Sequence, residues 1–333
     1  DYAVNRVQGT HIDDMFNKNA KNCAIIEHED VRRMLLEMRS ITEGGRVLSA
    51  QTALQIDISH NHPDEAERAK AKAYIDLMTP IVKAMTDDYY DVTDNAVQVL
   101  GGHGFVSDQG VEQLQRDARI TRIYEGTNGI QAKDLTMRKV LQNAAKNHNG
   151  DIAAAIAPVL DPIRELVAQH AGNEAMADYI QPLADGLKSL EEATQSRMAN
   201  AQGGVSNVDA ASTPYLKLFT KVALGGVWAQ QAAKAQEKLQ AEGLSADDQA
   251  FYEAKLVTAG FYQNVTLAKE HAALKDRVVD GKRWLPDLPD VAVAHRKGME
   301  KPAPANDNIA DIVAKGPKSA TDHAQRASGE ISR

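Results

Sequence analysis

Apolar residues recur every three or four positions along most of this chain, and this spacing constrains the fold more than any other feature of the sequence. Over residues 30–58 the apolar positions fall on one face of a helix: Val31, Leu35, Met38 and Ile41. Asp30 is expected to cap this helix. No segment has a convincing strand pattern, and aromatic residues make up only 5% of the chain, fewer than sheet-rich proteins usually carry. The sequence therefore predicts an all-α fold.

The same periodicity predicts further helices, separated where glycine or proline interrupts the pattern. One helix is expected to start after Pro63 and to continue, kinked at Pro80, as far as the glycines of residues 101–104. Shorter helices are expected over residues 111–120 and 130–143. The spacing then predicts two helices within residues 151–201, a glycine-containing linker at 201–207, and a helical hairpin over residues 213–241 and 245–271.

Charge and composition exclude several classes of protein. The formal net charge is −8 and the isoelectric point is near 5.7, which argues against a general preference for nucleic acid or anionic membranes. No run of about 18 apolar residues is present, as a membrane-spanning helix would need, and the first residues do not resemble a signal peptide. The single cysteine, Cys23, cannot form an intrachain disulfide. We expect a cytoplasmic protein.

Most candidate catalytic or metal-binding residues have an ordinary structural interpretation. His28, Glu29, His60 and His62 lack the i, i+4 pairing of a helical zinc site, so we expect solvated histidines near helix ends and no metal. No GxSxG motif indicates a nucleophilic serine. The GGHG segment follows an expected helix and differs from the GxGxxG of a dinucleotide-binding turn.

Glu125 is the carboxylate with the most unusual surroundings. It lies between Tyr124 and Gly126 in a turn-rich segment that precedes the helix expected from Ile130. A lone glutamate in such a loop could act as a desolvated general base. The ordinary interpretation, which periodicity alone favours, is a capping-turn carboxylate in contact with water. The residues alone leave both interpretations open.

Three blocks of sequence, in matching order and spacing, resemble the C-terminal helical domain of the acyl-CoA dehydrogenase family. They are residues 98–105 (QVLGGHGF), 116–120 (RDARI) and 123–131 (IYEGTNGIQ). The first residues, with Tyr2, Ala3, Arg6 and Gly9, resemble a helix of the family, and residues 25–40 resemble the helix that follows it. Residues 146–285 are similar, more weakly, to the extra helical domain of longer bacterial members, some of which act on methylthio-propanoyl-CoA.

The resemblance implies a domain organisation. Residues 1–147 would form an up-down four-helix bundle, residues 148–286 a second helical domain, and residues 287–333 a flexible tail. The family's N-terminal helical domain and middle β-domain have no counterpart in this sequence. We therefore expect the C-terminal part of a longer enzyme, which by itself binds FAD weakly and turns over no substrate.

The resemblance also implies roles for individual residues. The family uses FAD to oxidise an acyl-CoA to the trans-2-enoyl-CoA, and Glu125 aligns with the general base, whose backbone N–H helps to bind the thioester oxygen. Tyr124 and Gly126 would contact the substrate. The expected FAD contacts, some of them with the FAD of a neighbouring subunit, are Arg6, Gln98, Gly101, Gly102, Thr127 and Gln131. Gln8 stands where family members often have an aromatic residue.

The remaining implications concern supporting residues and partners. Arg116, Asp117 and Arg119 are expected to form an ion-paired network that holds the catalytic loop, and Arg122 either joins it or reaches the CoA phosphates. The shared FAD site implies at least a two-fold homodimer, and the extra helical domain, as a replacement for a second dimer contact, favours a dimer over a tetramer. The expected electron acceptor is an electron-transfer flavoprotein. The alternatives are an acyl-CoA oxidase that uses O₂ and a non-catalytic helical relative.

Overall fold

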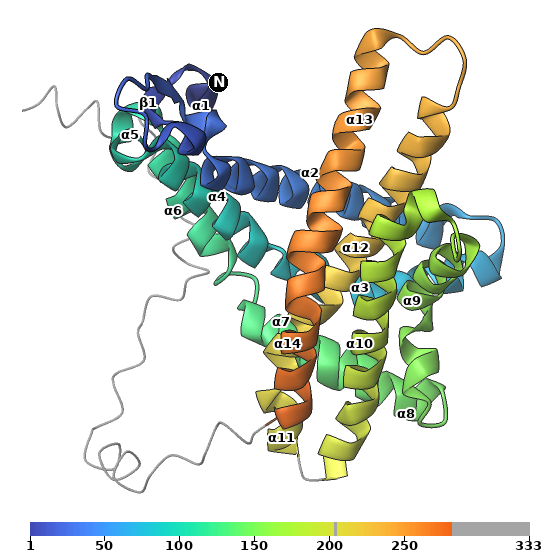
Figure 1. Ribbon diagram of the computed structural model, residues 1–333. Helices are drawn as coiled ribbons and strands as arrows, with labels where there is room; N and C mark the ends of the chain where they lie inside the picture. The colour runs from blue at the N-terminus through green and yellow to red at the C-terminus, as the bar shows by residue number, and fades with distance from the viewer. Residues whose placement is uncertain (203–204, 282–333) are drawn as a thin grey trace, which may run out of the picture. The chain divides into compact units, whose positions relative to one another are not determined.

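Helices make up nearly all of the structure in the part of the chain that it describes, which confirms the all-α prediction (Figure 1). The computed structural model describes residues 1–202 and 205–281; the tail expected over residues 287–333 lies outside them. The helices are α1 (Tyr2–Asn5), α2 (Glu29–Asn61), α3 (Glu65–Ala84), α4 (Thr86–Leu100), α5 (Gly102–Phe105), α6 (Val111–Thr121), α7 (Asn128–Lys133), α8 (Asn143–Asn147), α9 (Ile152–Gln169), α10 (Ala177–Gln202), α11 (Val205–Ala210), α12 (Ser212–Leu239), α13 (Ala246–Phe261) and α14 (Ala268–Asp280).

Short 3₁₀ and π segments complete the helical elements. The 3₁₀ turns span Ile12–Asp14, Ile25–Glu27, Ser107–Gln109 and Glu174–Met176. Two π-helical stretches, Asp134–Gln142 and Tyr262–Leu267, join α7 to α8 and α13 to α14 without interruption. The helices expected over residues 130–143 and 245–271 are therefore each continuous in the structure. Helix also covers most of the expected linker at residues 201–207, because α10 continues to Gln202 and α11 begins at Val205.

A small antiparallel sheet corrects the prediction that the chain has no strands. Strand β1 (Val7–Thr10) pairs with β2 (Asn22–Ala24), and Val7 lies opposite Ala24. The helix expected at the start of the chain is only the four residues of α1. The hairpin is short and mostly exposed, so it has no buried face to impose a period of two on its sequence.

Several helix boundaries differ from the expected ones, and the last helix continues to Asp280, beyond the expected end at residue 271. His28, and not Asp30, is the N-cap residue of α2, and Asp30 instead forms an ion pair with Arg33 (2.9 Å) in the first turn. The helix expected to be kinked at Pro80 is divided into α3 and α4 at Met85, while Pro80 lies inside α3. Met85 is fully buried and packs against Gly45 of α2, where an added Cβ would lie 2.5 Å from its Cε. The break therefore lies where Met85 packs against α2, and not at the proline.

Helix α12 is the centre of the described structure. It contacts α2, α3, α7, α9, α10, α13 and α14, and most of its residues from Ser212 to Ala229 are buried. Its Trp228 donates a hydrogen bond from the indole Nε1 to the carbonyl oxygen of Ser40 in α2 (3.0 Å). Gly44 permits this approach, because a Cβ at that position would lie 2.6 Å from the indole nitrogen.

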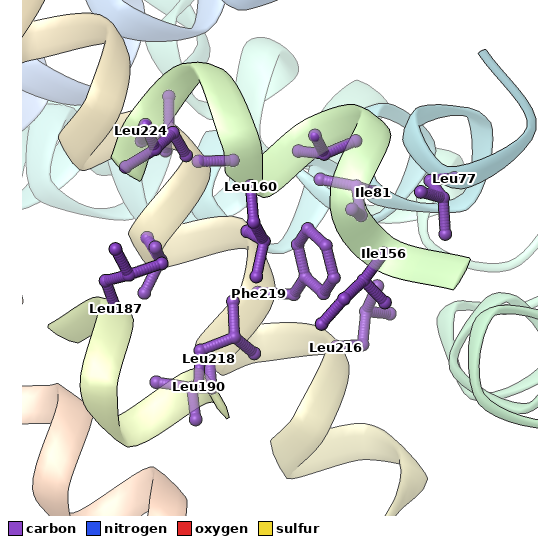
Figure 2. Close-up of a cluster of buried hydrophobic side chains, with 14 of the residues drawn as sticks. Leu77, Ile81, Ile156, Leu160, Leu187, Leu190, Leu216, Leu218, Phe219 and Leu224 are labelled. Carbon is purple, nitrogen blue, oxygen red and sulfur yellow. The ribbon is translucent and has the colours of Figure 1, made fainter. Parts of the chain in front are cut away.

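One hydrophobic core is shared by helices from before and after residue 147. Figure 2 shows Leu77 and Ile81 of α3 beside Ile156 and Leu160 of α9, and the same cluster includes Phe219 of α12. Residues 1–281 accordingly belong to one compact unit. The division into domains at residue 147 stays a prediction. Residues from both sides of that position belong to the same hydrophobic core.

The contact between Gly44 and Trp228 yields a stability prediction. Gly44→Ala should lower the free energy of unfolding by about 1–3 kcal/mol, because the added methyl group overpacks the core. Denaturant unfolding followed by circular dichroism measures the change.

Gly260→Ala is the matched control for this substitution. Gly260 is also inside a helix, but its Cβ would have an ordinary contact, 3.8 Å from Tyr179. Because alanine is the better helix former, this variant should be more stable than the parent chain by up to about 1 kcal/mol. Equal unfolding curves for the two variants would show that the close approach of α2 and α12 has no energetic consequence.

Candidate active site

The predicted site residues form two groups, one at each end of α4. Figure 1 shows α1, β1 and α5 gathered at the C-terminal end of α4, where Tyr2 hydrogen-bonds His103 (2.9 Å) and Ala3 packs in one cluster with Val99. This end carries the expected cofactor residues Arg6, Gln98, Gly101 and Gly102. The segment of residues 122–131 lies at the other end. A helix of 15 residues separates the two groups by about 22 Å.

The group at the N-terminal end of α4 is centred on a loop, residues 122–128, which we call the Glu125 loop. Glu125 has φ = 54° and Gly126 has φ = 82°, so both residues are in the left-handed region. Only Asn149 shares this conformation with Glu125 among the non-glycine residues described. Residues held in such conformations cost free energy and cluster at functional sites. The backbone of the Glu125 loop therefore supports the functional interpretation of Glu125.

The other residues predicted for this group surround Glu125. Gln131 donates a hydrogen bond from Nε2 to the carbonyl oxygen of Glu125 (3.2 Å). The Thr127 hydroxyl caps α7 by accepting a hydrogen bond from the Ile130 N–H (3.3 Å). A Cβ at Gly126 would lie 3.1 Å from Gln131 Nε2, so glycine suits both the space and the backbone angle at this position. The structure thus places Tyr124, Glu125, Gly126, Thr127 and Gln131 in one segment, and their functional roles stay predictions.

Several apolar side chains in and beside the Glu125 loop are exposed at the surface. Glu125 is itself exposed, and Ile123, Tyr124 and Ile130 are 39%, 41% and 56% exposed. Large apolar side chains exposed together are typical of surfaces that bind a partner or a ligand. The arrangement places one carboxylate among groups that could contact an apolar ligand.

Both ends of the Glu125 loop are anchored by residues that the sequence did not point to. At its start, Arg122 Nε forms an ion pair with Asp87 (2.5 Å), and the guanidinium lies over the ring of Tyr90 (5.0 Å). At its end, the Asn128 side chain accepts a hydrogen bond from Lys83 Nζ (2.7 Å). The partners are about 35–45 positions apart in the sequence, so no local motif signals them. The ion-pairing role considered for Arg122 is the one that the structure supports.

The ion-paired network expected of Arg116, Asp117 and Arg119 is wrong. All three side chains are exposed on α6, and none of them forms an ion pair with a described residue. Asp117 accepts a hydrogen bond from Gln113 (2.7 Å). These residues project into solvent because α6 packs on α4 through another face, where Gln115 hydrogen-bonds Asp94 (2.6 Å).

The contacts of the histidines considered for metal binding do not indicate a metal site. His28 hydrogen-bonds the carbonyl oxygen of Gln8 (2.8 Å). Across residues 1–202 and 205–281, no group of three His, Cys, Asp or Glu side chains could hold a metal ion. Within the same residues, no helix combines the length and apolar character needed to span a membrane. Cys23 is half-buried in β2.

Comparisons with known proteins identify the family. The model for the acyl-CoA dehydrogenase C-terminal domain matches residues 4–140, and the model described as acetyl-CoA dehydrogenase C-terminal like matches residues 150–289. The 3-methylmercaptopropionyl-CoA dehydrogenase of Ruegeria pomeroyi is 34% identical over 280 residues, which cover 83% of this chain and 45% of that protein. The chain belongs to the acyl-CoA dehydrogenase family.

Other family members agree with this assignment. The broad-specificity linear acyl-CoA dehydrogenase FadE5 of Mycobacterium tuberculosis is 34% identical over 269 residues, which cover 78% of this chain and 43% of that protein. The chain thus spans less than half the length of these two relatives.

Solved structures share the fold. ACDH-11 of Caenorhabditis elegans, solved in complex with C11-CoA, has a TM-score of 0.61 at 17% identity, over 86% of this chain and 43% of that one. Acyl-CoA oxidase 3 of Yarrowia lipolytica has a TM-score of 0.51 at 15% identity, over 96% of this chain and 53% of that one. At these identities the likeness shows the fold alone.

The left-handed backbone of Glu125 yields a second stability prediction. Glu125→Gly should raise the free energy of unfolding by up to about 1 kcal/mol, because glycine removes the steric cost of positive φ. Glu125→Gln keeps that cost and should leave stability unchanged. Urea unfolding of the three chains compares them directly, and a glycine variant less stable than the glutamine variant would refute a strained Glu125.

Proposed function

We propose that this chain supplies the catalytic base and part of the FAD-binding surface of an FAD-dependent acyl-CoA dehydrogenase, which oxidises an acyl-CoA thioester to the trans-2-enoyl-CoA. The observation that carries the proposal is the Glu125 loop, a carboxylate held at positive φ among exposed apolar side chains. The named relatives act on acyl-CoA compounds, which supports the same substrate class for this chain.

In the proposed reaction, Glu125 removes the proton from the α-carbon of the thioester. The backbone N–H of Glu125 forms no hydrogen bond with any described residue, so it is available to bind the thioester oxygen as negative charge develops there. Ile123, Tyr124 and Ile130 would contact the substrate and exclude water from the carboxylate. FAD, when bound, accepts the hydride from the β-carbon.

The surface at the C-terminal end of α4 fits an FAD contact. A Cβ at either Gly101 or Gly102 would meet no atom within 4 Å, and Gly101 has φ = 58°, so these glycines leave open backbone for a flat or anionic group to approach. Arg6 is exposed at the same end and could bind a pyrophosphate with its planar fork of donors. Gln98 would join these residues in holding the cofactor.

The separation of the two groups suggests that they serve two different FAD molecules. Thr127 and Gln131 would contact the flavin next to Glu125, while Arg6, Gln98, Gly101 and Gly102, about 22 Å away by the length of α4, would contact the FAD of a neighbouring subunit. Such sharing makes each subunit complete the site of the other in a two-fold dimer. We therefore propose a homodimer, with an electron-transfer flavoprotein as the acceptor and the bacterial cytoplasm as the compartment.

The dehydrogenase is favoured over an acyl-CoA oxidase by the sequence comparisons. The relatives at 34% identity are named dehydrogenases, whereas the oxidase structure shares only the fold at 15% identity.

Glu125→Gln tests the catalytic base. In the FAD-loaded enzyme this variant should lower the rate of flavin reduction by an acyl-CoA substrate at least 100-fold, which is the scale of general base catalysis. Anaerobic stopped-flow absorbance of the flavin measures that rate. Asp117→Asn is the control, because this acid is exposed on α6 and, within the described residues, forms no ion pair and accepts a hydrogen bond from Gln113. A Glu125→Gln rate close to that of the parent enzyme would remove Glu125 as the base.

Arg6→Met tests the proposed cofactor contact. This variant should retain less FAD per subunit after gel filtration, because it removes the cation opposite the pyrophosphate. The ratio of flavin to protein absorbance gives the FAD content. Arg33→Met, which removes an exposed arginine from α2, should keep the full complement of FAD. Equal FAD contents in the two variants would argue against the role of Arg6.

A further inference from the structure

Helix α12 contacts the segment that carries Glu125 from the far end of the sequence. It packs on α7, the helix that the Glu125 loop leads into. Ala132 of α7 and the adjoining Leu135 are fully buried in the same hydrophobic cluster as Leu216 and Phe219 of α12. The end of the Glu125 loop therefore rests on a helix that lies some 85 residues later in the chain.

Ion pairs connect α12 to the start of the loop as well. Lys217 and Lys221, four residues apart on α12, face two consecutive aspartates of α4. Lys217 Nζ lies 3.9 Å from Asp87, and Lys221 Nζ lies 3.0 Å from Asp88. Asp87 in turn holds Arg122, the first residue of the Glu125 loop. A line of charges thus leads from α12 through α4 to the loop.

The pair of Lys221 and Asp88 is buried and has further partners. Their side chains are 11% and 13% exposed. Glu270 of α14 lies 3.4 Å from Lys221 Nζ, and the Tyr262 hydroxyl donates a hydrogen bond to the Lys221 carbonyl oxygen (3.0 Å). Burial lowers the pKa of Lys221, but the charges of Asp88 and Glu270 more than reverse this effect, so its pKa lies above the usual value and the ammonium group stays charged. Buried ion pairs contribute little net stability compared with apolar packing. This pair instead fixes the position of Lys221 on α12 relative to Asp88 on α4.

A small cavity separates the loop from α12 at this point. Its volume is about 130 Å³, and its lining includes Asn128, Asp87, Asp88, Lys217 and Lys221. Side chains therefore do not fill the space behind the end of the Glu125 loop. Polar contacts around this cavity, together with the apolar packing of α7 on α12, connect α4, α12 and the loop.

We propose that Lys217 and Lys221 of α12 are positioning residues for the Glu125 loop: Lys217 acts through Asp87, which pairs with Arg122, and Lys221 acts by fixing the adjacent Asp88 in the first turn of α4. The helices after residue 150 then have a specific part in the active site, which is to fix the position from which Glu125 approaches the substrate. The catalytic significance of this positioning rests on the proposed function, but the positioning itself does not.

Hydrogen exchange of the FAD-loaded enzyme tests the proposal without requiring turnover. The reporters are the backbone amides of Tyr124, Asn128 and Gln131, which donate to carbonyl oxygens of residues 120, 122 and 127. Lys221→Met should accelerate their exchange at least tenfold, and Lys217→Met by a smaller factor. Peptides from α9 should keep the parent exchange rates, which shows that the variants are folded.

Lys255→Met is the matched control. Lys255 also joins two helices through an ion pair, to Glu43 at 2.7 Å, and its side chain is only 16% exposed. It connects α13 to α2, away from the Glu125 loop. This variant should leave the exchange of the reporter amides unchanged. Equal acceleration in Lys255→Met and Lys221→Met, or no acceleration in Lys221→Met, would overturn the proposal.

Two further variants keep the test decisive if Lys221→Met does not fold. Lys217 is 47% exposed, so Lys217→Met should fold. The double variant Lys217→Met with Asp87→Asn should exchange its reporter amides no faster than Asp87→Asn alone. Additive effects of the two substitutions would overturn the proposed route through Asp87. Lys217→Arg should restore parent exchange rates, since it retains the charge, and a failure to restore them would count against an electrostatic role.

Activity measurements separate this proposal from the proposed function. In the same enzyme, Lys217→Met should lower kcat/KM severalfold, because the Glu125 loop carries both the proposed base and the proposed substrate contacts. If the loop loosens in Lys217→Met while Glu125→Gln remains fully active, the assignment of the base fails and the positioning stands. If exchange is unchanged while Glu125→Gln is inactive, the positioning fails and the base stands.

Discussion

The enclosure of α12 is the constraint on which the rest of the described structure depends. A helix that is apolar on nearly all sides has to be surrounded by other elements, and Tyr215, Phe219 and Trp228 are fully buried. The surrounding helices come from both sides of residue 147: α2, α3 and α7 on one side, and α9, α10, α13 and α14 on the other. The regions matched by the two family models therefore bury their apolar surfaces against each other.

Contacts at both ends of the Glu125 loop explain how it can keep a costly backbone conformation. A glutamate at positive φ persists only where the surroundings determine the chain path at both ends. Arg122 and Asn128 provide those two fixed points, through Asp87 and Lys83. Both partners belong to the junction of α3 and α4, where Met85 turns the chain while packing on α2. The division of one expected helix into two is thus part of the construction of the site.

The expectations that held are those with a strong local cause. The helix expected after Pro63 begins there as α3, with Asp64 as the N-cap residue that accepts a hydrogen bond from the Ala66 N–H, and Gly101 ends α4 with a positive φ. Local causes were not sufficient everywhere, since His28 and not Asp30 is the N-cap residue of α2, and the chain breaks at Met85 and not at Pro80. The other failures had no local signal: the β1–β2 hairpin has no buried face, and Arg116 and Arg119 belong to the exposed surface of α6. The contact of Asn128 with Lys83 has no local signal either, because it forms where α3 and α7 pack together.

By itself, the sequence determined the helical class, the positions of most helix ends and the segment that holds the candidate base. Hydrophobic period, helix capping and glycine backbone preferences act within a few residues, so they can be recognised along the chain. The tertiary structure decided which residues anchor the Glu125 loop, that two groups of site residues lie at opposite ends of α4, and that one core crosses residue 147. Those features depend on contacts such as Lys221 with Asp88, 133 positions apart, and neither periodicity nor spacing encodes a contact at that distance.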